Sequence, residues 1–471
     1  MPYSETTITA LDALRRALVS NHFDGMHQAL RGAAYFESPM IRPKDGRTYG
    51  AGLDRMSPTA QALLRTFYLG EAAEAEEIAA LIGEEALAAL VSLGLVAREA
   101  NRVSFEAFRL VPYQGQFFWV NRFLGGEKRD DFAVYLGPDS YALAQRIPAC
   151  PGKSVLDVCS GSGVQAITAA ARMGVETVVG LELLPEAIRV AEINAALNGV
   201  AARVQFRRSD LFAALAPGET FDLILCNPPF VPCPPDLALP EYSGSGPTGT
   251  DFMARFLTEL PRVLARPGRV RLVFDGYGDQ AGTGVDELVR RFLKENPEFG
   301  AALYLPCRTL VTDSFLARLG LTILMYSGLG DAEMQRVGES VYRHFLRLGF
   351  THTYPNALLE LDSDVAPPRR GRLEVIRAFS AWHPGSVPEW CYRPDVAQRF
   401  ELHLADGAVV PVLQSDAPFL RSINGQTTVE SLLRSITADG RADIDVLEHL
   451  VSLCAQLEEH GAMRHAAAGV S

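Results

Sequence analysis

The stretch that decides the fold is KSVLDVCSGSGVQAITAAARMG, residues 153 to 174. SVLDV predicts a short buried strand, Gly161 and Gly163 follow it in a turn, and the remainder predicts a helix that Gly174 ends. A glycine-rich turn between a strand and a helix lets a ligand approach backbone N–H groups. A lone glycine-rich turn is a weak signal, so the segments that follow it decide which ligand it takes.

Three further predicted strands also end on polar residues. TVVGLEL brings Glu182, VQFRRSDLF brings Asp210, and FDLILCNPPF runs into Asn227. Together with Asp157 they fall at the carboxyl ends of successive strands, which is where open α/β sheets bind ligands. The loop lacks the G-x-G-x-x-G of dinucleotide enzymes. Asp157, just before the loop, suits a ligand with a cationic amino-acid tail better than a pyrophosphate.

These segments resemble the class I S-adenosylmethionine-dependent methyltransferases with an (N/D)PP(Y/F) motif, over about residues 130 to 280 and more weakly to about 360. The resemblance implies an enzyme of class EC 2.1.1 with S-adenosyl-L-methionine as cofactor, S-adenosyl-L-homocysteine as product and no metal. The family usually has glycine where Cys159 stands, a departure that leaves Gly161 and Gly163 in place. The cofactor-binding residues implied are Asp157, Ser160, Gly161, Gly163, Glu182, Leu183, Asp210, Leu211 and Asn227.

The resemblance also assigns roles to these residues. Asp157 is expected to reach the methionine amino group, and Glu182 the ribose hydroxyls. Asp210 is expected to accept a hydrogen bond from the adenine amino group, with Leu211 packed beside the ring. Asp139, just before the core, is a candidate for a further contact.

The motif NPPF, residues 227 to 230, carries the expected chemistry. In the resembling family it handles planar nitrogen nucleophiles, so Asn227, Pro228 and Phe230 are the predicted catalytic residues. The Asn227 side-chain carbonyl and the Pro228 backbone carbonyl can each accept one N–H bond, while Phe230 stacks on a flat acceptor. The two prolines, Pro228 and Pro229, stiffen the backbone, so catalysis rests on positioning and needs no metal and no covalent intermediate.

The predicted fold class is α/β: a doubly wound, mainly parallel seven-stranded methyltransferase sheet with a domain on either side. We expect a helical, winged-helix-like α+β domain over residues 1–128, the methyltransferase domain over 129–366 and a small α+β domain over 367–471. In the last unit, Asp406-Gly407 predicts a hairpin turn. This unit also loosely resembles small modules that bind leader peptides.

Composition limits the partners. The 471 residues are 48% hydrophobic with a net charge of −12, which disfavours nucleic acid as the main partner. The candidate recognition helix of the winged unit, residues 84–93, contains no Lys or Arg, so we do not expect it to read DNA. Seven dispersed cysteines indicate free thiols rather than disulfides or zinc. No secretion signal or membrane span is evident, which predicts a cytoplasmic protein.

The methyl acceptor is the open question. The flanking units and a Pro/Gly/Ser-rich stretch, residues 234–250, suggest a covered pocket in which Glu241 and Tyr242 meet the substrate, beside Pro229 and Asp139. We therefore expect a small molecule bearing an amino, amide or guanidino nitrogen. The alternatives are an RNA guanine-N2 methyltransferase, a glutamine-type methyltransferase of a protein or peptide, and a non-catalytic binding protein that keeps a relic cofactor fold.

Overall fold

The computed structural model describes most of the chain up to residue 377 and shorter stretches beyond it. The described residues are 3–24, 53, 56–105, 107–121, 134–149, 151–235, 237, 244–279, 281–306, 308–311, 331–377, 388–391, 396–397, 401–403, 409–411, 416–437, 446, 450–451, 453–454, 457 and 462–465.

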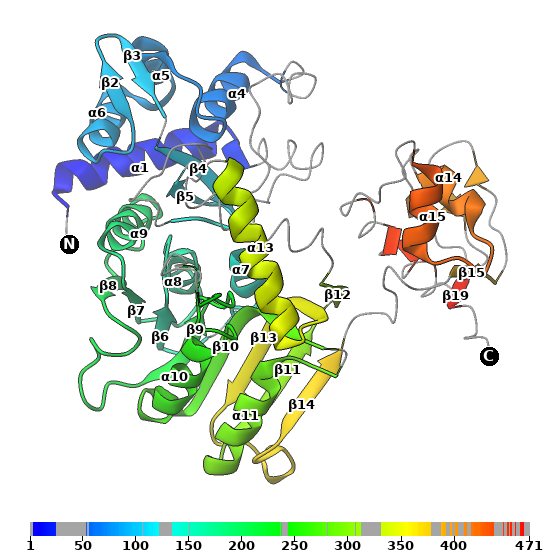
Figure 1. Cartoon of the computed structure of the whole chain (residues 1–471). Coiled ribbons are helices and arrows are strands. Elements are labelled where there is room, and N and C mark those ends of the chain that lie inside the picture. The colour runs from blue at the N-terminus through cyan, green and yellow to red at the C-terminus, as the bar shows by residue number, and fades with distance from the viewer. Residues whose placement is uncertain are drawn as a thin grey trace.

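A nine-stranded, mainly parallel sheet forms the centre of the molecule (Figure 1). Its order is β14-β11-β13-β10-β9-β6-β7-β8, and β12 pairs with β13. Every neighbouring pair is parallel except those made by β13, which runs antiparallel to β10, β11 and β12. The strands are β6 (Ser154–Val158), β7 (Thr177–Glu182), β8 (Val204–Arg208), β9 (Phe221–Cys226), β10 (Leu264–Gly278), β11 (Gly300–Leu305), β12 (Thr309–Leu310), β13 (His352–Asp362) and β14 (Leu373–Arg377).

The predicted α/β class with a mainly parallel sheet is confirmed, but the predicted number of seven strands is wrong. Two strands are added, because β12 pairs with one end of β13 and β14 lies parallel to β11. A short 3-10 turn, Pro367–Arg369, leads the chain back to that edge. The sheet therefore includes residues 373–377, which the sequence placed in the C-terminal unit.

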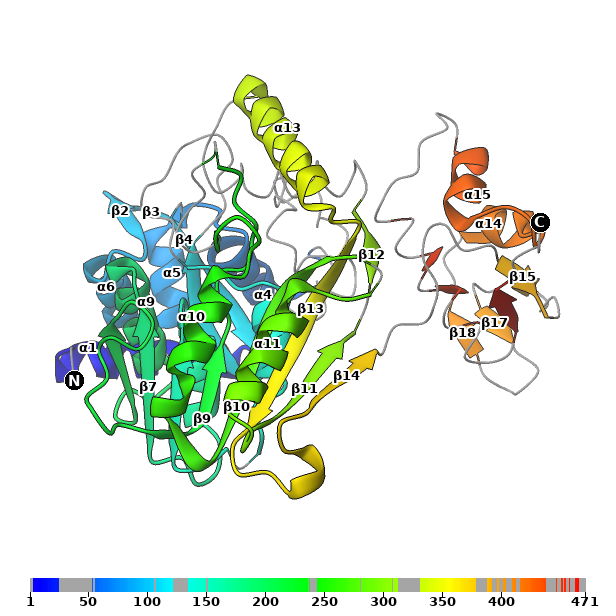
Figure 2. The ribbon, with the colours of Figure 1, turned by 60° about the horizontal axis from the view of Figure 1, so that its bottom comes forward.

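Helices cover both faces of the sheet (Figure 2). Side chains alternate along each strand, so Val155 joins the core under α8 and α9, whereas its neighbour Leu156 joins the core under α10 and α11. Burial on both faces explains why these strands read as continuous apolar runs. The helices are α7 (Pro138–Ala144), α8 (Val164–Ala170), α9 (Pro185–Leu197), α10 (Asp251–Glu259), α11 (Gly284–Glu295) and α13 (Asp331–Leu348).

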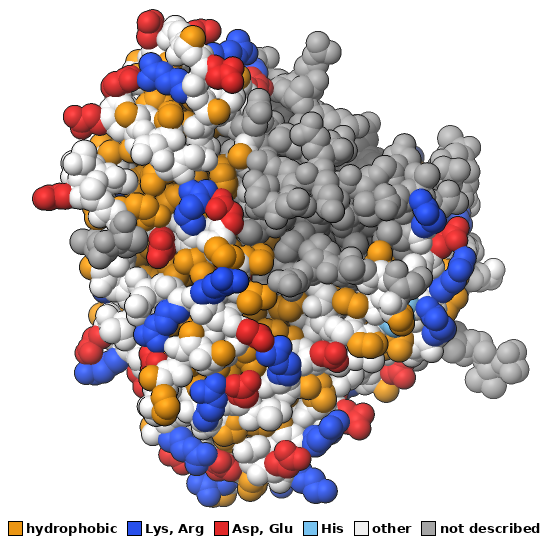
Figure 3. Space-filling model, turned by 60° about the vertical axis from the view of Figure 1, so that its left-hand side comes forward, with side chains coloured by type: hydrophobic (Ala, Val, Ile, Leu, Met, Phe, Trp, Pro, Cys, Tyr) orange, Lys and Arg blue, Asp and Glu red, His pale blue; other side chains and the backbone are white. Residues whose placement is uncertain are grey.

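The N-terminal part has helices around a small antiparallel sheet of order β1-β3-β2. Ser57 caps the helix that begins at Pro58, because its side chain accepts a hydrogen bond from the backbone N–H of Ala60. On the face shown in Figure 3, acidic and basic side chains are interspersed rather than gathered by sign. The elements are α1 (Glu5–Ser20), α4 (Pro58–Leu63), a π-helical turn (Leu64–Tyr68), β1 (Ala73–Glu74), α5 (Ala75–Ile82), α6 (Glu84–Ser92), β2 (Ala97–Glu99) and β3 (Arg102–Ser104).

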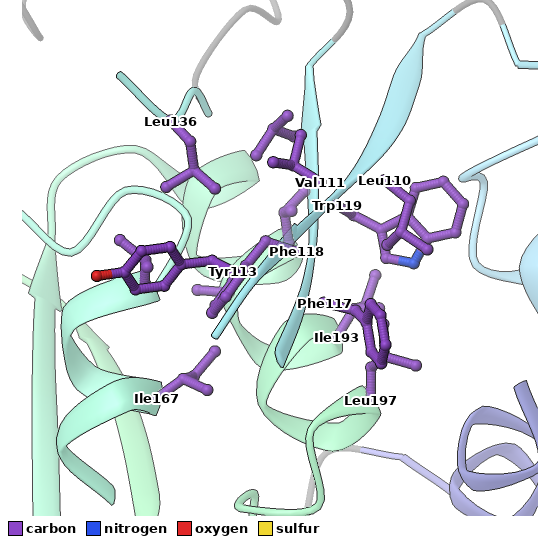
Figure 4. Close-up of a cluster of buried hydrophobic side chains, with 14 of the residues drawn as sticks. Leu110, Val111, Tyr113, Phe117, Phe118, Trp119, Leu136, Ile167, Ile193 and Leu197 are labelled. Carbon is purple, nitrogen blue, oxygen red and sulfur yellow. The ribbon is translucent and has the colours of Figure 1, made fainter. Parts of the chain in front are cut away.

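The hairpin of β4 (Phe108–Tyr113) and β5 (Gln116–Asn121) joins the N-terminal part to the sheet domain. Asn194 on α9 accepts from the backbone N–H of Trp119 at 2.8 Å and donates to its carbonyl at 3.1 Å. Asn198, one turn later, makes the same pair of bonds with Phe117 at 2.9 and 2.7 Å. The two asparagines thus pair with the hairpin backbone as a neighbouring strand would. Figure 4 shows the aromatic side chains of this hairpin packed with the helices that cover the sheet.

The C-terminal part has its own apolar core, to which α14 (Ala417–Ser422), α15 (Val429–Ile436) and residues between 450 and 463 contribute. It lies apart from the large sheet in both Figure 1 and Figure 2. The hairpin expected around Asp406-Gly407 is present as the pair β17 (Glu401–His403) and β18 (Val409–Pro411), although the turn itself lies outside the described residues. The other strands here are β15 (Pro388–Trp390), β16 (Val396–Ala397) and β19 (Met463–His465).

Two further features concern the described residues alone. The cysteines described there are free thiols, namely Cys159, Cys226, Cys233, Cys391 and Cys454. A search of the helices within the described ranges finds none that is long and apolar enough to cross a membrane.

Candidate active site

The loop after β6 contains three residues with left-handed backbone angles: Cys159 (φ 61°), Gly161 (φ 50°) and Gly163 (φ 77°). The two glycines meet different surroundings. A Cβ at Gly163 would come within 2.9 Å of the Phe206 ring, whereas a Cβ at Gly161 would meet nothing within 4 Å. Gly163 therefore serves close packing, and Gly161 faces open space. Cys159 adopts a conformation that costs little for glycine and more for other residues.

Asp157 lies on β6 and is 1% exposed. Its Oδ2 accepts from the backbone N–H of Ala166 at 3.1 Å, and its Oδ1 has no hydrogen-bond partner among the described residues. Burial raises the pKa of Asp157 to about 8, with the nearby Glu182 adding to the rise and the hydrogen bonds opposing it. A buried carboxylate with an unpaired oxygen is costly unless a cationic group or donor meets it.

Glu182 ends β7 and ties the glycine loop to that strand. Its Oε2 accepts from the backbone N–H of Gly161 at 2.9 Å, and its Oε1 accepts from those of Leu183 and Leu184 at 2.7 and 3.0 Å. Burial raises the pKa of Glu182, and these three N–H groups oppose that rise. Carboxylate oxygens have further lone pairs, so the side chain can still accept from hydroxyl donors. The Leu183 side chain is 38% exposed beside it.

Asp210 and Leu211 follow β8 in a turn where Leu211 has a φ of 51°. Leu211 is buried in the core. The Asp210 side chain is 59% exposed and pairs with Arg255 on α10 at 2.9 Å. The two neighbours therefore have different surroundings: Leu211 packs into the core beneath the turn, whereas Asp210 forms an ion pair with Arg255 at the surface. The hydroxyl of Ser209 holds the same turn, donating to the Leu211 carbonyl at 2.8 Å and accepting from Ala214 at 3.0 Å.

Asn227 begins the NPPF segment at the tip of β9. Its Nδ2 donates to Asp139 Oδ2 at 2.9 Å, with Ser140 Oγ at 3.5 Å as a weaker acceptor. The Tyr135 hydroxyl donates to the same Asp139 oxygen at 2.6 Å. Asp139 is buried near the start of α7. These contacts fix the Asn227 amide with its NH₂ toward α7, so its Oδ1 faces away, and that atom has no partner among the described residues.

A pocket lies beside this segment. Residues of the motif, of the loop before α10, of α10 itself, of β10 and of the start of α11 form its wall. They are Pro228, Pro229, Phe230, Thr248, Gly249, Thr250, Met253, Phe274, Asp275, Gly276, Tyr277, Gly284 and Val285. The pocket thus unites three of the predicted motif residues with a part of β10. Glu241 and Tyr242, predicted to meet the substrate, lie outside the described residues.

The structure adds residues to the site that the sequence did not single out. Asp275 lines the pocket, Arg255 holds Asp210, and Ser209 holds the turn between them. Asp275 is an acidic residue in the strand after NPPF, as Asp157 and Glu182 are in two strands before it. That repetition was the available signal for Asp275.

The fold and this arrangement of loop, acids and amide define a class I methyltransferase. Residues 136–276 match the family described as Methyltransferase small domain. A protein described as "Putative protein N5-glutamine methyltransferase" from Methanocaldococcus jannaschii is 31% identical over 179 residues, covering 37% of this chain and 86% of that protein. The chain therefore belongs to the S-adenosylmethionine-dependent methyltransferases of this family, with N5-glutamine methyltransferases as homologues, and it is an enzyme of class EC 2.1.1.

Two more relatives are similar over a shorter length. A release factor glutamine methyltransferase of Koribacter versatilis is 46% identical over 132 residues, covering 26% of this chain and 46% of that protein. A ribosomal protein uL3 glutamine methyltransferase of Bordetella pertussis is 37% identical over 121 residues, covering 24% of this chain and 40% of that protein. The chain thus matches less than half the length of these two relatives.

Proposed function

We propose that this chain methylates the side-chain amide nitrogen of glutamine in a protein or peptide. The observation that carries the proposal is the fixed Asn227 amide, whose Oδ1 has no partner among the described residues and which directly precedes Pro228 and Phe230 in the pocket wall. The side-chain NH₂ of a substrate glutamine offers two N–H donors. They match two acceptors here, the Asn227 side-chain carbonyl and the Pro228 backbone carbonyl. The names of the three relatives all specify a glutamine methyltransferase, which supports the same acceptor.

The residues of the cofactor side fit S-adenosylmethionine. Asp157 Oδ1, buried and unpaired, suits the cationic amino group of the methionine portion. The open space at Gly161 leaves room for a ligand against the loop, with Ser160 and Gly163 holding the turn. Glu182 is assigned to the ribose hydroxyls beside Leu183.

The adenine end is assigned to the turn after β8. Leu211 supports it from the core, and Asp210 is the proposed acceptor for the adenine amino group. Arg255 already pairs with Asp210 at 2.9 Å, so the adenine amino group either displaces Arg255 or binds Asp210 alongside it. Both partners are more than half exposed, so the pair contributes little to stability by itself.

Positioning accounts for the chemistry we assign to the motif. S-adenosylmethionine supplies a sulfonium-bound methyl group. The amide nitrogen is a weak nucleophile because its lone pair is delocalised. Asn227 Oδ1 and the Pro228 carbonyl hold its two N–H groups, and Phe230 stacks on the planar amide, while Pro229 keeps the backbone rigid. These contacts hold the nitrogen in the orientation from which it attacks the methyl group. Such orientation lowers the activation free energy by several kcal/mol in well-oriented reactions.

The expected small-molecule acceptor receives no specific support from the relatives, whose names specify proteins. The glutamine-type alternative is therefore the better-supported acceptor. A nucleic-acid acceptor stays disfavoured, because α6 contains Glu84 and Glu85 in its first turn and no basic residue. The metal-free character of the reaction remains our expectation from the motif chemistry.

The flanking parts are assigned to recognition of the protein acceptor. We retain the division at residues 1–128, 129–366 and 367–471 as a proposal, with the winged-helix-like part docked on the sheet domain through Asn194 and Asn198. The C-terminal part, with its separate core, is the proposed module for binding an acceptor segment outside the reacting glutamine. Residues 234–250 are the proposed cover of the pocket.

The test is transfer of labelled methyl groups from S-adenosylmethionine to a cell extract that is then fractionated into proteins, nucleic acids and small molecules. We expect label in protein, located on glutamine by peptide mass spectrometry. Asn227→Ala is expected to lose it, whereas Asn296→Ala, at the end of α11, is the matched control and keeps it. Label confined to small molecules would restore the small-molecule acceptor, and label confined to RNA would contradict both.

A further inference from the structure

Asp275 sits at a β-bulge. The pairing of β10 with β13 shifts register between Phe274 and Gly276, and β13 contributes an additional residue opposite Asp275. Asn356, in that bulge, has a left-handed φ of 52°. Its backbone N–H donates to Asp275 Oδ1 at 2.8 Å instead of continuing the strand pairing. Bulges and left-handed non-glycine residues concentrate near functional sites, where they redirect side chains.

The carboxyl group fixed in this way belongs to the acceptor pocket. Asp275 lines it together with Pro228 and Phe230. The strand register agrees, because Cys226 pairs with Leu272 in the parallel β9–β10 pair, and Asn227 and Asp275 both follow this pair in the same direction. With Oδ1 bound by the bulge, Oδ2 is the atom left for a ligand, and it has no partner among the described residues.

A second carboxylate connects Asp275 to Asn227. Asp139, on α7, accepts the Asn227 Nδ2 bond, and its charge also acts on Asp275. Burial, and then the charge of Asp275, raise the pKa of Tyr277, which lies two residues further along β10. From β13, the Asn356 backbone N–H contacts Asp275. Burial first, and then Asp139, raise the pKa of Asp275 to about 7, while the Asn356 bond opposes the rise.

We propose that Asp275 Oδ2 accepts the proton that the acceptor nitrogen loses during methyl transfer, which makes Asp275 a further catalytic residue. The inference rests on the proposed N-methylation at this site. The nitrogen lone pair forms the new N–C bond, and the sulfur keeps the electron pair of the broken C–S bond. One N–H bond then breaks, its electron pair stays on nitrogen, and the proton forms an O–H bond on Asp275. The carbonyls of Asn227 and Pro228 hold the two N–H groups, and one of them gives up its N–H to Asp275, because neither carbonyl keeps a proton near neutral pH.

This role gives the reaction a defined pH dependence. Only the ionised Asp275 can take the proton, so the turnover number kcat rises with pH as Asp275 ionises in the enzyme–substrate complex; in the ligand-free protein its pKa is about 7. A group that merely recognised the acceptor would change KM and leave the pH limb of kcat in place. The two roles are therefore separable by measurement.

The decisive variant is Asp275→Asn, which keeps an oxygen to accept the Asn356 N–H. We expect kcat to fall roughly 100-fold and its acid limb to disappear. Calorimetric affinity for S-adenosylmethionine should stay near wild type, as should the thermal unfolding midpoint at acidic pH, where Asp275 is protonated in the folded wild type. Asp279→Asn, an exposed residue just after β10 whose side chain binds only its own turn, is the matched control and keeps the limb. A variant that retains the limb, with KM alone raised, overturns the proposal.

A second measurement does not depend on turnover. Carboxyl carbon NMR of the ligand-free protein, with the Asp275 signal assigned by its loss in Asp275→Asn, should give a titration near pH 7. A midpoint at the ordinary aspartate value overturns the proposal. The kinetic comparison uses whichever acceptor the wild type labels. Label in small molecules would thus contradict the glutamine acceptor while still testing Asp275.

Discussion

Asn227 and Asp139 lie 88 residues apart, and the Asn227 amide donates to the Asp139 carboxylate at 2.9 Å. An amide can present either its oxygen or its NH₂ to the substrate, and a carboxylate accepts only from NH₂. Asp139 therefore selects the orientation in which Asn227 offers its oxygen to an N–H donor. The Tyr135 hydroxyl, at 2.6 Å, holds Asp139 in turn.

Substitutions at Asp139 should show whether it acts by orienting the Asn227 amide or by its negative charge. Asp139→Leu removes the acceptor, so the Asn227 amide is free to rotate, and we expect kcat to fall by roughly 10- to 100-fold with little change in cofactor affinity. Asp139→Asn can turn its own oxygen to Asn227 and should keep most of kcat. Steady-state kinetics and calorimetry check both. Equal loss in the two variants would refute orientation as the role.

Asp139→Asn should also move the pH profile. The Asp139 charge contributes to the raised pKa of Asp275, so its removal lowers that pKa. The active form of Asp275 is the ionised one, and the acid limb of kcat therefore shifts to lower pH. The measurement is kcat from pH 5.5 to 8.5 at saturating substrates (roughly the range that brackets a pKa near 7). A limb that stays in place would show that the two carboxyl groups are not coupled.

Asp157 should make the stability of the ligand-free protein depend on pH. Its folded pKa of about 8 lies above the ordinary value of 3.8, so the folded state holds a proton that the unfolded state releases. Stability from this group is complete below about pH 4 and falls as pH rises to about 8, by on the order of a few kcal/mol. Asp157→Asn should reduce this slope and leave the part that comes from Asp275, whose pKa is also raised, as measured by urea unfolding at pH 5 and pH 8.

Binding of a cationic ligand at Asp157 carries a second signature. An ammonium group favours the ionised carboxylate, so S-adenosylmethionine should release a proton on binding near pH 7. Calorimetry in two buffers of different ionisation enthalpy measures that proton. Proton release that persists in Asp157→Asn would place its source at another residue.

Local pattern explains why the positions of Asp157, Gly161 and Glu182 in the fold were predictable and the position of Asp275 was not. Asp157, Gly161 and Glu182 each follow from a strand, a turn and a chain order that neighbouring residues encode. Asp275 depends on Asn356, because the bulge arises in the pairing of β10 with β13, and α11, β11, β12 and α13 lie between these strands in the chain. The pattern of apolar and polar residues along either strand does not indicate how β10 and β13 align with each other.

Three other features could not be predicted from the sequence, each for a different physical reason. The strand count was underestimated because Leu373–Arg377 is short, and only the free edge of β11 makes it part of the sheet. Asp210 was expected to face a ligand, and the structure pairs it with Arg255, a residue whose position depends on how α10 packs. Docking of the hairpin through Asn194 was likewise not foreseen, because asparagine within a helix carries no signal for pairing with a distant backbone.

Asn194 should therefore be a point of high sensitivity for stability. Asn194→Leu leaves the N–H and the carbonyl of Trp119 buried without partners, and each such group costs about 1–3 kcal/mol. We expect destabilisation of about 2–4 kcal/mol in urea unfolding. Asn21→Leu, at the end of α1, is a control with a solvent-accessible partner. A loss no larger than that of the control would contradict the strand-like docking.

Gly161 and Gly218 offer a matched pair for testing where the cofactor passes. Both have left-handed backbone angles, of 50° and 82°, and at both a Cβ would meet nothing within 4 Å in the ligand-free protein. Alanine at either position should therefore cost similar stability, about 1 kcal/mol, from backbone strain alone. Only Gly161→Ala places a methyl group in the space assigned to the ligand, so we expect its affinity for S-adenosylmethionine to fall at least tenfold, roughly the effect of losing 1.4 kcal/mol. Calorimetric titration of both variants checks this, and equal affinities would move the cofactor path away from Gly161.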